Sequence, residues 1–479
     1  MDKHPSNTTD VDTALKNAGF GKFHILIVIT GGLMMYTANS ESWSIGYAIS
    51  SAECEMGLDL HEKTLLLSIG SLGMISTQFF WGYLSDKIGR RIVLIQTLLL
   101  GCICNIFSIL VTPFWLIATF RFMNGAFIAG ASGLSIAYVS EFFSSRHRSI
   151  AILIMSIFIG LALIMIPLWA WLIIPEKVSW TFLGKHLDAW RIYMLVSGLP
   201  ALLACFTLYF CPESPKYLVQ AQCYQEALEV LKQIHKINNN QTEFTTEKLS
   251  NDEVGNKDVQ IWKLFSFKYV WKTFVLCILQ GGVFATSCGL FLWYPDIIKH
   301  ISVSKEDVTV CQALDFGKTD TETDCDSVDD SVYVQNILVG VAYTVGYVVI
   351  SALVNKIGIR NILVSFLGVA GLATFALHVV VNQDIINILF ILLLTLSGVC
   401  AVVVNAAVVD LYPTKMRGMA ICMVMLSGRI GSILASFLVG YLLIWNCQVT
   451  FILFGVSLIG CSILSVALTL YLPNKNCWE

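Results

Sequence analysis

The sequence has few charged residues for its length. Only 13% of the 479 residues are Asp, Glu, Lys or Arg, and 56% are hydrophobic, whereas about 25% of the residues in soluble globular proteins are charged. A soluble chain of this size could not bury so much apolar surface. The apolar residues fall in runs of roughly twenty, the length that an α-helix needs to cross a hydrocarbon core. The composition therefore predicts an all-α polytopic membrane protein.

Several motifs are also missing. The chain has 15 cysteines, but no Cys/His spacing has the pattern of a zinc site, so we expect no metal. No basic patch suggests a nucleic-acid partner, and no nucleotide-binding G-x-x-x-x-G-K-[ST] motif is present. No nucleophile, base and oxyanion group can be assembled, which argues against an enzyme. We also expect no cofactor, and the polar N-terminus has no apolar core of the signal-peptide kind.

The apolar residues form twelve runs, six on either side of a polar stretch. Six runs, a gap and six more runs indicate two pseudo-symmetric six-helix bundles. We expect a first bundle at 23–210, a linker at 211–270 and a second bundle at 271–472, with terminal segments at 1–22 and 473–479. The expected transmembrane helices are 23–49, 64–84, 92–111, 114–140, 150–174, 190–210, 271–294, 333–354, 362–381, 388–409, 420–445 and 449–472.

The positive charges indicate an orientation. Most of the 30 Lys and Arg residues lie in the terminal segments and even-numbered loops of this layout. Loops rich in Lys and Arg face the cytoplasm. We therefore expect both termini to be cytoplasmic.

Two segments outside the apolar runs have a distinct composition. In the linker, Ala227, Leu228, Leu231 and Ile234 recur at helical spacing and predict an amphipathic cytoplasmic helix. The segment 295–331 has ten Asp or Glu against three Lys, and it faces the exterior or a lumen in this topology. Its two cysteines, Cys311 and Cys325, could pair in an oxidising compartment. The alternative is two free thiols, because a sequence does not show whether two cysteines come close enough to pair.

The connection between the second and third runs packs four charged residues into a short turn, G-Y-L-S-D-K-I-G-R-R. Gly82 and Gly89 permit tight turns. Asp86 can accept hydrogen bonds from the free amides of the next helix or pair with an arginine. Arg90 and Arg91 mark the cytoplasmic face.

This pattern, G-x-L-x-D-x-x-G-R-R, resembles the loop between helices two and three of the major facilitator superfamily. Arg121 and Gly125 match the R-x-x-x-G pattern of that superfamily, and PESP at 212–215 looks like the PESP motif of its sugar and organic-ion branches. D-L-Y-P-T-x-x-R, from Asp410 to Arg417, resembles E-L-Y-P-T-x-x-R of organic-ion transporters and the synaptic vesicle glycoprotein 2 family. The resemblance implies transport of a small organic solute by alternating access, and without a nucleotide motif any uphill transport would use a solute or proton gradient.

The likeness to the synaptic vesicle glycoprotein 2 group extends through 51–53, Trp190 and Arg191. Two departures are the short N-terminal segment and the short loop after the seventh helix, so a vesicle-specific role does not follow. Ala38 also replaces an acid of that group. The alternative function is therefore a non-transporting membrane protein that acts by binding partners.

Glu41 and Arg429 are ionic residues inside predicted membrane helices, where a charge is costly unless it faces a cavity or a partner. Glu41 has three candidate roles: proton carrier, cation contact or partner of an arginine. The segment around Arg429, R-I-G-S-I, looks like the R-x-G-S-I stretch of organic anion transporters, which implies an anionic substrate. The competing explanation is that Arg429 pairs with Glu41 across the two bundles.

Two further residues are candidates for substrate binding or coupling. Arg121 could contact substrate, but in the family pattern such an arginine more often serves structure or proton coupling. The pKa range of a histidine suits His378 to proton transfer. The alternative for His378 is a simple hydrogen bond near a helix end.

The charges at the cytoplasmic ends predict a gate. The loop that mirrors the first one, N-K-I-G-I-R-N at 355–361, has lost its acid, so the stronger gate is expected on the N-terminal side. There we expect Asp86 and the basic residues beside it to pair with Glu141 and with Arg146 or Arg148. Asp410 and Arg417 would form a weaker counterpart.

These observations lead to one expectation for the whole chain. It moves a small organic solute, with H+ as a candidate coupling ion, and it is integral to a lipid bilayer. Plasma membrane and secretory or synaptic vesicle membrane both fit the charge pattern, and a monomer is favoured.

Overall fold

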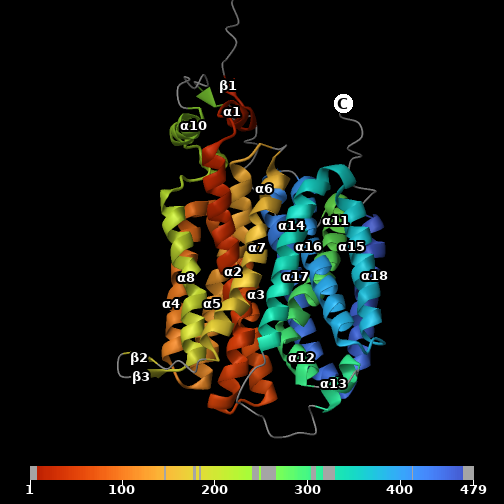
Figure 1. Ribbon diagram of the computed structural model, residues 1–479. Coiled ribbons are helices and arrows are strands. Elements are labelled where there is room, and N and C mark those ends of the chain that lie inside the picture. The colour runs from red at the N-terminus through yellow and green to blue at the C-terminus, as the bar shows by residue number, and fades with distance from the viewer. Residues whose placement is uncertain are drawn as a thin grey trace, which may run out of the picture.

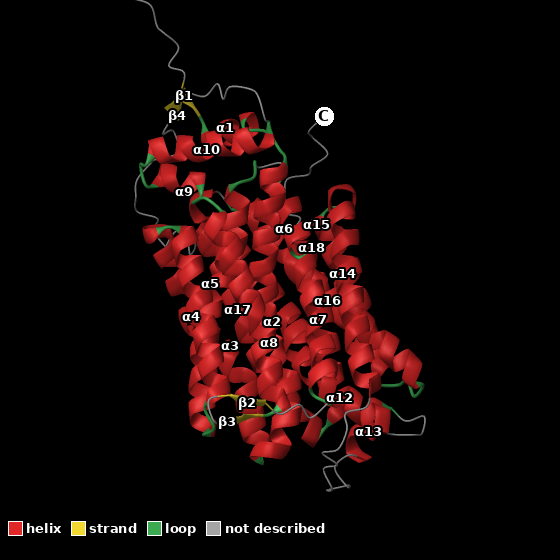
Figure 2. Cartoon of the chain, turned by 60° about the vertical axis from the view of Figure 1, so that its left-hand side comes forward, coloured by secondary structure: helices red, strands yellow, loops and turns green. Residues whose placement is uncertain are grey.

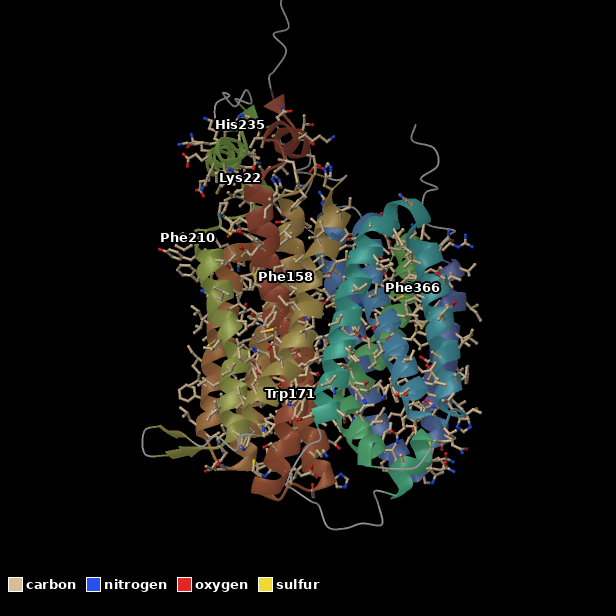
Figure 3. All side chains as sticks on the ribbon, viewed as in Figure 1. Lys22, Phe158, Trp171, Phe210, His235 and Phe366 are labelled. Atoms are coloured by element: carbon tan, nitrogen blue, oxygen red, sulfur yellow. A yellow bond between two sulfur atoms is a disulfide. The ribbon has the colours of Figure 1, made fainter. Side chains whose placement is uncertain are left out.

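A computed structural model describes residues 8–144, 147–175, 180–182, 185–239, 248–249, 266–303, 309–316, 330–412 and 414–467. Within these ranges, twelve helices are long and apolar enough to cross a membrane. The expected all-α, twelve-helix fold is confirmed. Many of the large apolar side chains on the outside of the helices are exposed, as lipid-facing residues would be; Figure 3 shows one of them, Phe210, pointing away from the bundle.

The helices form two groups side by side (Figure 1). The first group consists of α2 (Lys22–Met56), α3 (Leu60–Ile88), α4 (Arg90–Leu110), α5 (Phe114–Glu141), α6 (Arg148–Met155), α7 (Ile157–Ile173) and α8 (Ala189–Phe210). The second consists of α11 (Phe267–Phe284), the π-helix η2 (Ala285–Leu290), α12 (Phe291–Val303), α14 (Asp330–Ile357), α15 (Ile359–Leu377), α16 (Gln383–Leu411), α17 (Thr414–Trp445) and α18 (Cys447–Ala467). We call them the N-half and the C-half.

The two halves meet along two pairs of helices. In one pair, α7 packs on α14, where a Cβ on Gly340 would lie 2.6 Å from the backbone of α7. In the other, α3 packs on α17. Small residues allow such close approach of helix backbones in a membrane.

Two of the expected transmembrane helices are interrupted. The fifth breaks between Met155 and Ile157, where the hydroxyl of Ser156 donates to the carbonyl of Ile152 and competes with the helical pattern. The seventh passes through η2 and continues as α12 to Val303. The candidate membrane span ends at Pro295, where the sequence places the start of the acidic loop, and the helix continues into that segment as far as Val303. Pro295 lies inside α12, where a local π-helical adjustment can accommodate it.

Glycines in the left-handed region connect consecutive helices at matching places in the two halves. Gly89, with φ +121°, lies between α3 and α4, and Gly358, with φ +85°, lies between α14 and α15. An L side chain would be strained at both positions. The second loop therefore repeats the glycine with positive φ of the first loop, but it has no acidic residue that corresponds to Asp86.

Small helices cover one end of the N-half (Figure 2). They are α1 (Val11–Asn17), α9 (Pro215–Gln220) and α10 (Tyr224–Asn238). α10 buries Ala227, Leu231 and Ile234, which are residues of the predicted apolar stripe. Short strands pair as β1 (Thr8–Thr9) with β4 (Lys248–Leu249) at this end, and as β2 (Trp180–Phe182) with β3 (Lys185–Leu187) at the opposite end. Lys22 and His235 lie at the α10 end (Figure 3).

The predicted cysteine pair is wrong. Cys311, in α13 (Val310–Phe316), forms its disulfide with Cys447 at the start of α18; Cys325 lies outside the described residues. α13 lies at the end of the molecule opposite α1 (Figure 1). The sequence reasoning searched only the acidic loop, but Cys447 begins a helix that enters from the same side, so its thiol reaches Cys311.

Candidate functional site

Arg429 lies where α17 crosses α11 in the C-half. The crossing is tight, because a Cβ on Gly431 would lie 2.2 Å from the carbonyl oxygen of Gly281. The Arg429 guanidinium lies over the ring of Phe284, 5.6 Å from its centroid. Arg429 is 5% exposed, its Nε has no hydrogen-bond partner, and no ion pair is formed with it among the described residues. Arg429 is thus a buried cation whose charge no carboxylate of the described residues balances.

Arg429 faces a cavity of about 60 Å³ between the two halves. Its walls are largely apolar, with a few polar side chains. From the C-half the polar ones include Ser287, Cys288, Tyr343, Tyr347 and Asn405 besides Arg429; from the N-half they are Asn39, Ser132 and Ser156. Sites for small molecules have this mixture of apolar walls and a few placed polar groups.

Contacts between the halves lie on both sides of this cavity. On the side of α12, the rings of Trp43 and Phe291 lie 5.4 Å apart, and the indole of Trp171 donates to the Asp330 carboxylate over 2.8 Å. On the side of α1, a Cβ on Gly82 would lie 3.2 Å from Sγ of Cys422 in α17. The two halves therefore close around the cavity.

Glu41 points away from this cavity. Residues 35, 39 and 43 of α2 are a helical turn apart and line the cavity, whereas Glu41 faces the interior of the N-half. There one oxygen accepts a hydrogen bond from Asn105 over 3.0 Å and the other lies 3.7 Å from Nη1 of Arg121. The alternative in which Glu41 pairs with Arg429 is wrong, because Glu41 lies on the face of α2 that points away from the cavity lined by Arg429.

Arg121 completes a polar network inside the N-half. Its Nη2 donates to Oδ1 of Asn105 over 2.9 Å, and Asn124 donates to the carbonyl of Gly101 over 2.9 Å. Glu41, Arg121 and Asn124 also line a second, smaller cavity of about 20 Å³. One or two water molecules need roughly that space. Sequence reasoning missed Asn105 and Asn124, although a polar amide inside an apolar run was the available signal.

The cytoplasmic charges are only partly placed as expected. Arg90 pairs with Asp86 over 2.9 Å and with Glu141 over 2.8 Å. Arg148 does not join them: its Nε donates to the carbonyl of Ser140, and its guanidinium lies 3.7 Å from the carboxylate of Asp12 in α1. The assignment of Arg148 to the gate is wrong, because α1 lies beside it, and no sequence pattern predicts that placement. Its alternative, Arg146, lies outside the described residues.

Asp12 also pairs with Lys216 of α9. Burial lowers the pKa of Lys216, and the neighbouring guanidinium of Arg148 lowers it further, while Asp12 opposes that shift. The first turn of α4 is likewise held by a residue that sequence reasoning missed: the Glu213 carboxylate accepts from the backbone amides of Arg90 and Arg91 over 3.1 Å, as an anion at a helix N-terminus does. The Arg91 side chain itself donates to backbone carbonyls at the end of α8.

Of the remaining predicted residues, the structure describes the side chain of His378, which lines neither of the two cavities. His378 lies at the end of α15, where its Nδ1 has no hydrogen-bond partner among the described residues. Arg146 lies outside the described residues, and the side chains of Asp410 and Arg417 also lie outside the described part of the chain. The weaker gate thus stays a prediction.

Comparisons with known proteins agree with this architecture. The family "Sugar (and other) transporter" matches residues 33–471. Human synaptic vesicle glycoprotein 2B is 27% identical over 323 residues, which cover 60% of this chain and 47% of that protein, and rat synaptic vesicle glycoprotein 2A is 27% identical over 60% of this chain and 44% of its own. The chain spans about half the length of these relatives.

Solved structures show the same fold. The major facilitator superfamily proton:xylose symporter XylE, bound to 6-bromo-6-deoxy-D-glucose, superposes with a TM-score of 0.71 at 16% identity, covering 94% of this chain and 96% of that one. A D-xylose-proton symporter structure superposes with a TM-score of 0.64 at 15% identity, covering 95% and 99%. With the family match over most of the chain, these findings show that the protein belongs to the sugar (and other) transporter family and has the major facilitator fold of a membrane transporter.

Proposed function

We propose that the protein carries a small organic anion across a membrane and that Arg429 binds the anionic group. The observation that carries this proposal is the buried guanidinium without a carboxylate partner among the described residues. A buried charge is costly when it is unpaired, and a guanidinium can bind a carboxylate through two hydrogen bonds. A bound organic anion would offset that cost.

The mechanism proposed is alternating access. The cavity lies between two six-helix halves that contact each other on both of its sides. Rocking one half against the other would open the cavity to one side at a time. On the side of α1, Arg90 holds α3, α4 and α5 together through Asp86 and Glu141, which supports a role for these charges in forming that gate.

We further propose that Glu41 carries the coupling proton. Its carboxylate is buried and lies beside Arg121, and it is separate from the cavity that holds Arg429. Protonation would release Arg121 from its counter-ion and so change the packing of α2 against α5.

The distribution of Lys and Arg residues supports an orientation in which both termini face the cytoplasm.

Counterflow into reconstituted vesicles tests the substrate. Vesicles preloaded with an unlabelled mixture of short carboxylates would receive a trace of each labelled acid, with labelled xylose in parallel. We expect saturable uptake of at least one acid and a roughly 10- to 100-fold loss in Arg429→Ala, from the strength of charge-assisted hydrogen bonds. Lys232→Ala removes a cation from the exposed face of α10 and should leave uptake unchanged.

Two results would overturn the proposal. If Arg429→Ala still takes up acids, Arg429 is not the residue that binds the anion. Uptake of xylose alone would indicate a neutral substrate. No flux of any solute in a folded protein would favour the partner-binding alternative.

The proton assignment has its own test. Glu41→Gln should retain counterflow but lose the accumulation of acid that an imposed pH gradient drives. Glu229→Gln, on the exposed face of α10, is the matched control. Accumulation that persists in Glu41→Gln would contradict the assignment.

A further inference from the structure

The two walls of the cavity differ in hydrogen-bonding capacity. On the N-half wall, the hydroxyl of Ser132 donates to the carbonyl of Ala129 over 2.9 Å, and that of Ser156 donates to Ile152 over 2.8 Å. Each hydroxyl hydrogen is therefore already used, and the oxygen can only accept.

Asn39 extends the same wall. Its Nδ2 donates to the carbonyl of Met35 over 2.7 Å. Because that partner is a carbonyl, the amide must present its nitrogen there, which fixes the orientation of the side chain. No donor reaches Oδ1 of Asn39 among the described residues, and this oxygen belongs to a residue that lines the cavity.

The C-half wall offers hydrogen-bond donors around Arg429. Arg429 has only donors, and its Nε has no hydrogen-bond partner among the described residues. The neighbouring amide of Asn405 accepts on Oδ1 from Gln280 over 3.4 Å, and Gln280 also donates to Sδ of Met425. The bond from Gln280 occupies Oδ1 of Asn405, so the NH2 group of Asn405 remains to donate to a ligand.

We propose that the transported solute is a hydroxy-substituted organic acid, held with its carboxylate at Arg429 and Asn405 and its hydroxyl at Asn39. This inference rests on the proposed function and names the substrate class of the same cavity. A hydroxyl fits the N-half wall better than an ammonium group does, because that wall offers neutral oxygens and Glu41 faces away from it. A buried ammonium without a carboxylate would be costly.

The same arrangement explains how the solute couples to closure. The acid end contacts the C-half and the hydroxyl end contacts the N-half, so a solute with both groups bridges the two walls. A solute that lacks the hydroxyl would leave Asn39 without its donor in the closed state. At roughly 10–15 Å³ for each water-sized particle, the cavity of about 60 Å³ would hold only a few water molecules, so the solute is small.

Matched acids test the inference on the purified full-length protein. Ligand-dependent thermal stabilisation would give the Kd of propionate, butyrate and valerate and of the same three acids with a terminal hydroxyl. We expect the best hydroxy acid to bind roughly 3- to 10-fold more tightly than its unsubstituted partner, the strength of one net hydrogen bond. The diol 1,4-butanediol, which has no acid, should not bind measurably.

Substitutions test whether the preference for hydroxy acids over plain acids comes from the N-half wall. Asn39→Leu should reduce the Kd ratio within each pair to about one, because the hydroxyl loses its acceptor. Asn336→Leu is a matched control, because Asn336 makes the same bond to the carbonyl four residues earlier but does not line the cavity. Ser132→Ala should lower the ratio in part and serves if Asn39→Leu does not fold.

The outcomes separate the two proposals. Equal Kd values within every pair, or an equal loss for both members in Asn39→Leu, would overturn the hydroxy-acid inference and leave the anion carrier standing. No stabilisation by any acid, or stabilisation that persists in Arg429→Ala, would overturn both.

Discussion

Arg121 and Arg429 are two equally buried arginines, each 5% exposed, in two equivalent halves of the molecule. In the N-half, Arg121 is surrounded by Glu41 and Asn105, which neutralise and hydrogen-bond it. In the C-half, the Arg429 guanidinium lies over the face of Phe284, and no carboxylate of the described residues pairs with it. The first arrangement satisfies a charge inside one bundle, whereas the second leaves the charge to be satisfied by something that enters the cavity.

The largest expected effect breaks the satisfied arrangement. Arg121→Met should destabilise the protein by about 3–5 kcal/mol, because Glu41 would be left as an uncompensated buried carboxylate. The midpoint of thermal unfolding in detergent, followed by a fluorescent thiol probe, measures the loss. A change under 1 kcal/mol would mean that the network does not stabilise the N-half.

Removing both charges together sharpens the same contrast. Glu41→Gln with Arg121→Met should recover part of the loss, with a coupling energy of about 1–3 kcal/mol between the two positions, because neither variant group is charged. A double-mutant cycle of unfolding free energies gives this value. Strict additivity would show that the 3.7 Å pair contributes nothing.

Arg429→Met should behave in the opposite way. Replacing an unpaired buried cation by an apolar side chain of similar length should leave stability unchanged or raise it by about 1–2 kcal/mol, while stabilisation by added carboxylates disappears. Arg429→Lys keeps the charge but not the planar fork and should retain weak binding. If Arg429→Met destabilised the protein as much as Arg121→Met, Arg429 would not differ from Arg121 in being an unpaired buried charge.

A smaller effect is expected at the α1 end. Arg90→Ala removes the link from Asp86 to Glu141 and should expose Cys422, which is buried beside Gly82. Mass spectrometry of the Cys422 peptide should show roughly tenfold faster alkylation, from about 1.4 kcal/mol less favourable closure. The matched control is Arg91→Ala, which should leave the rate unchanged, because the Arg91 side chain donates to carbonyls at the end of α8 in the same half.

The sequence predicted the parts of this molecule that depend on local composition. Runs of apolar residues gave the twelve helices, and Gly89 marked a turn that needs a positive φ. Glu41 and Arg429 stood out because charges are rare in such runs. Each of these signals is carried by a few neighbouring residues.

The errors all concern which residues meet in space. The pairing of Glu41 with Arg121 depends on which face of α2 each side chain occupies, and that of Cys311 with Cys447 depends on two helices 136 positions apart in the chain. Arg148 was assigned to the gate because α1 was not foreseen. The π-helix at Ala285–Leu290 has no composition signal that we recognise.

The most direct test is an electron cryomicroscopy map of the protein with and without a saturating hydroxy acid. The account predicts that Arg429 has no carboxylate within about 4 Å in the solute-free map, the range of an ion pair, and that solute density then joins Arg429 to Asn39. A map in which Glu41 or another protein carboxylate pairs with Arg429, or in which Arg429 faces lipid, would contradict it.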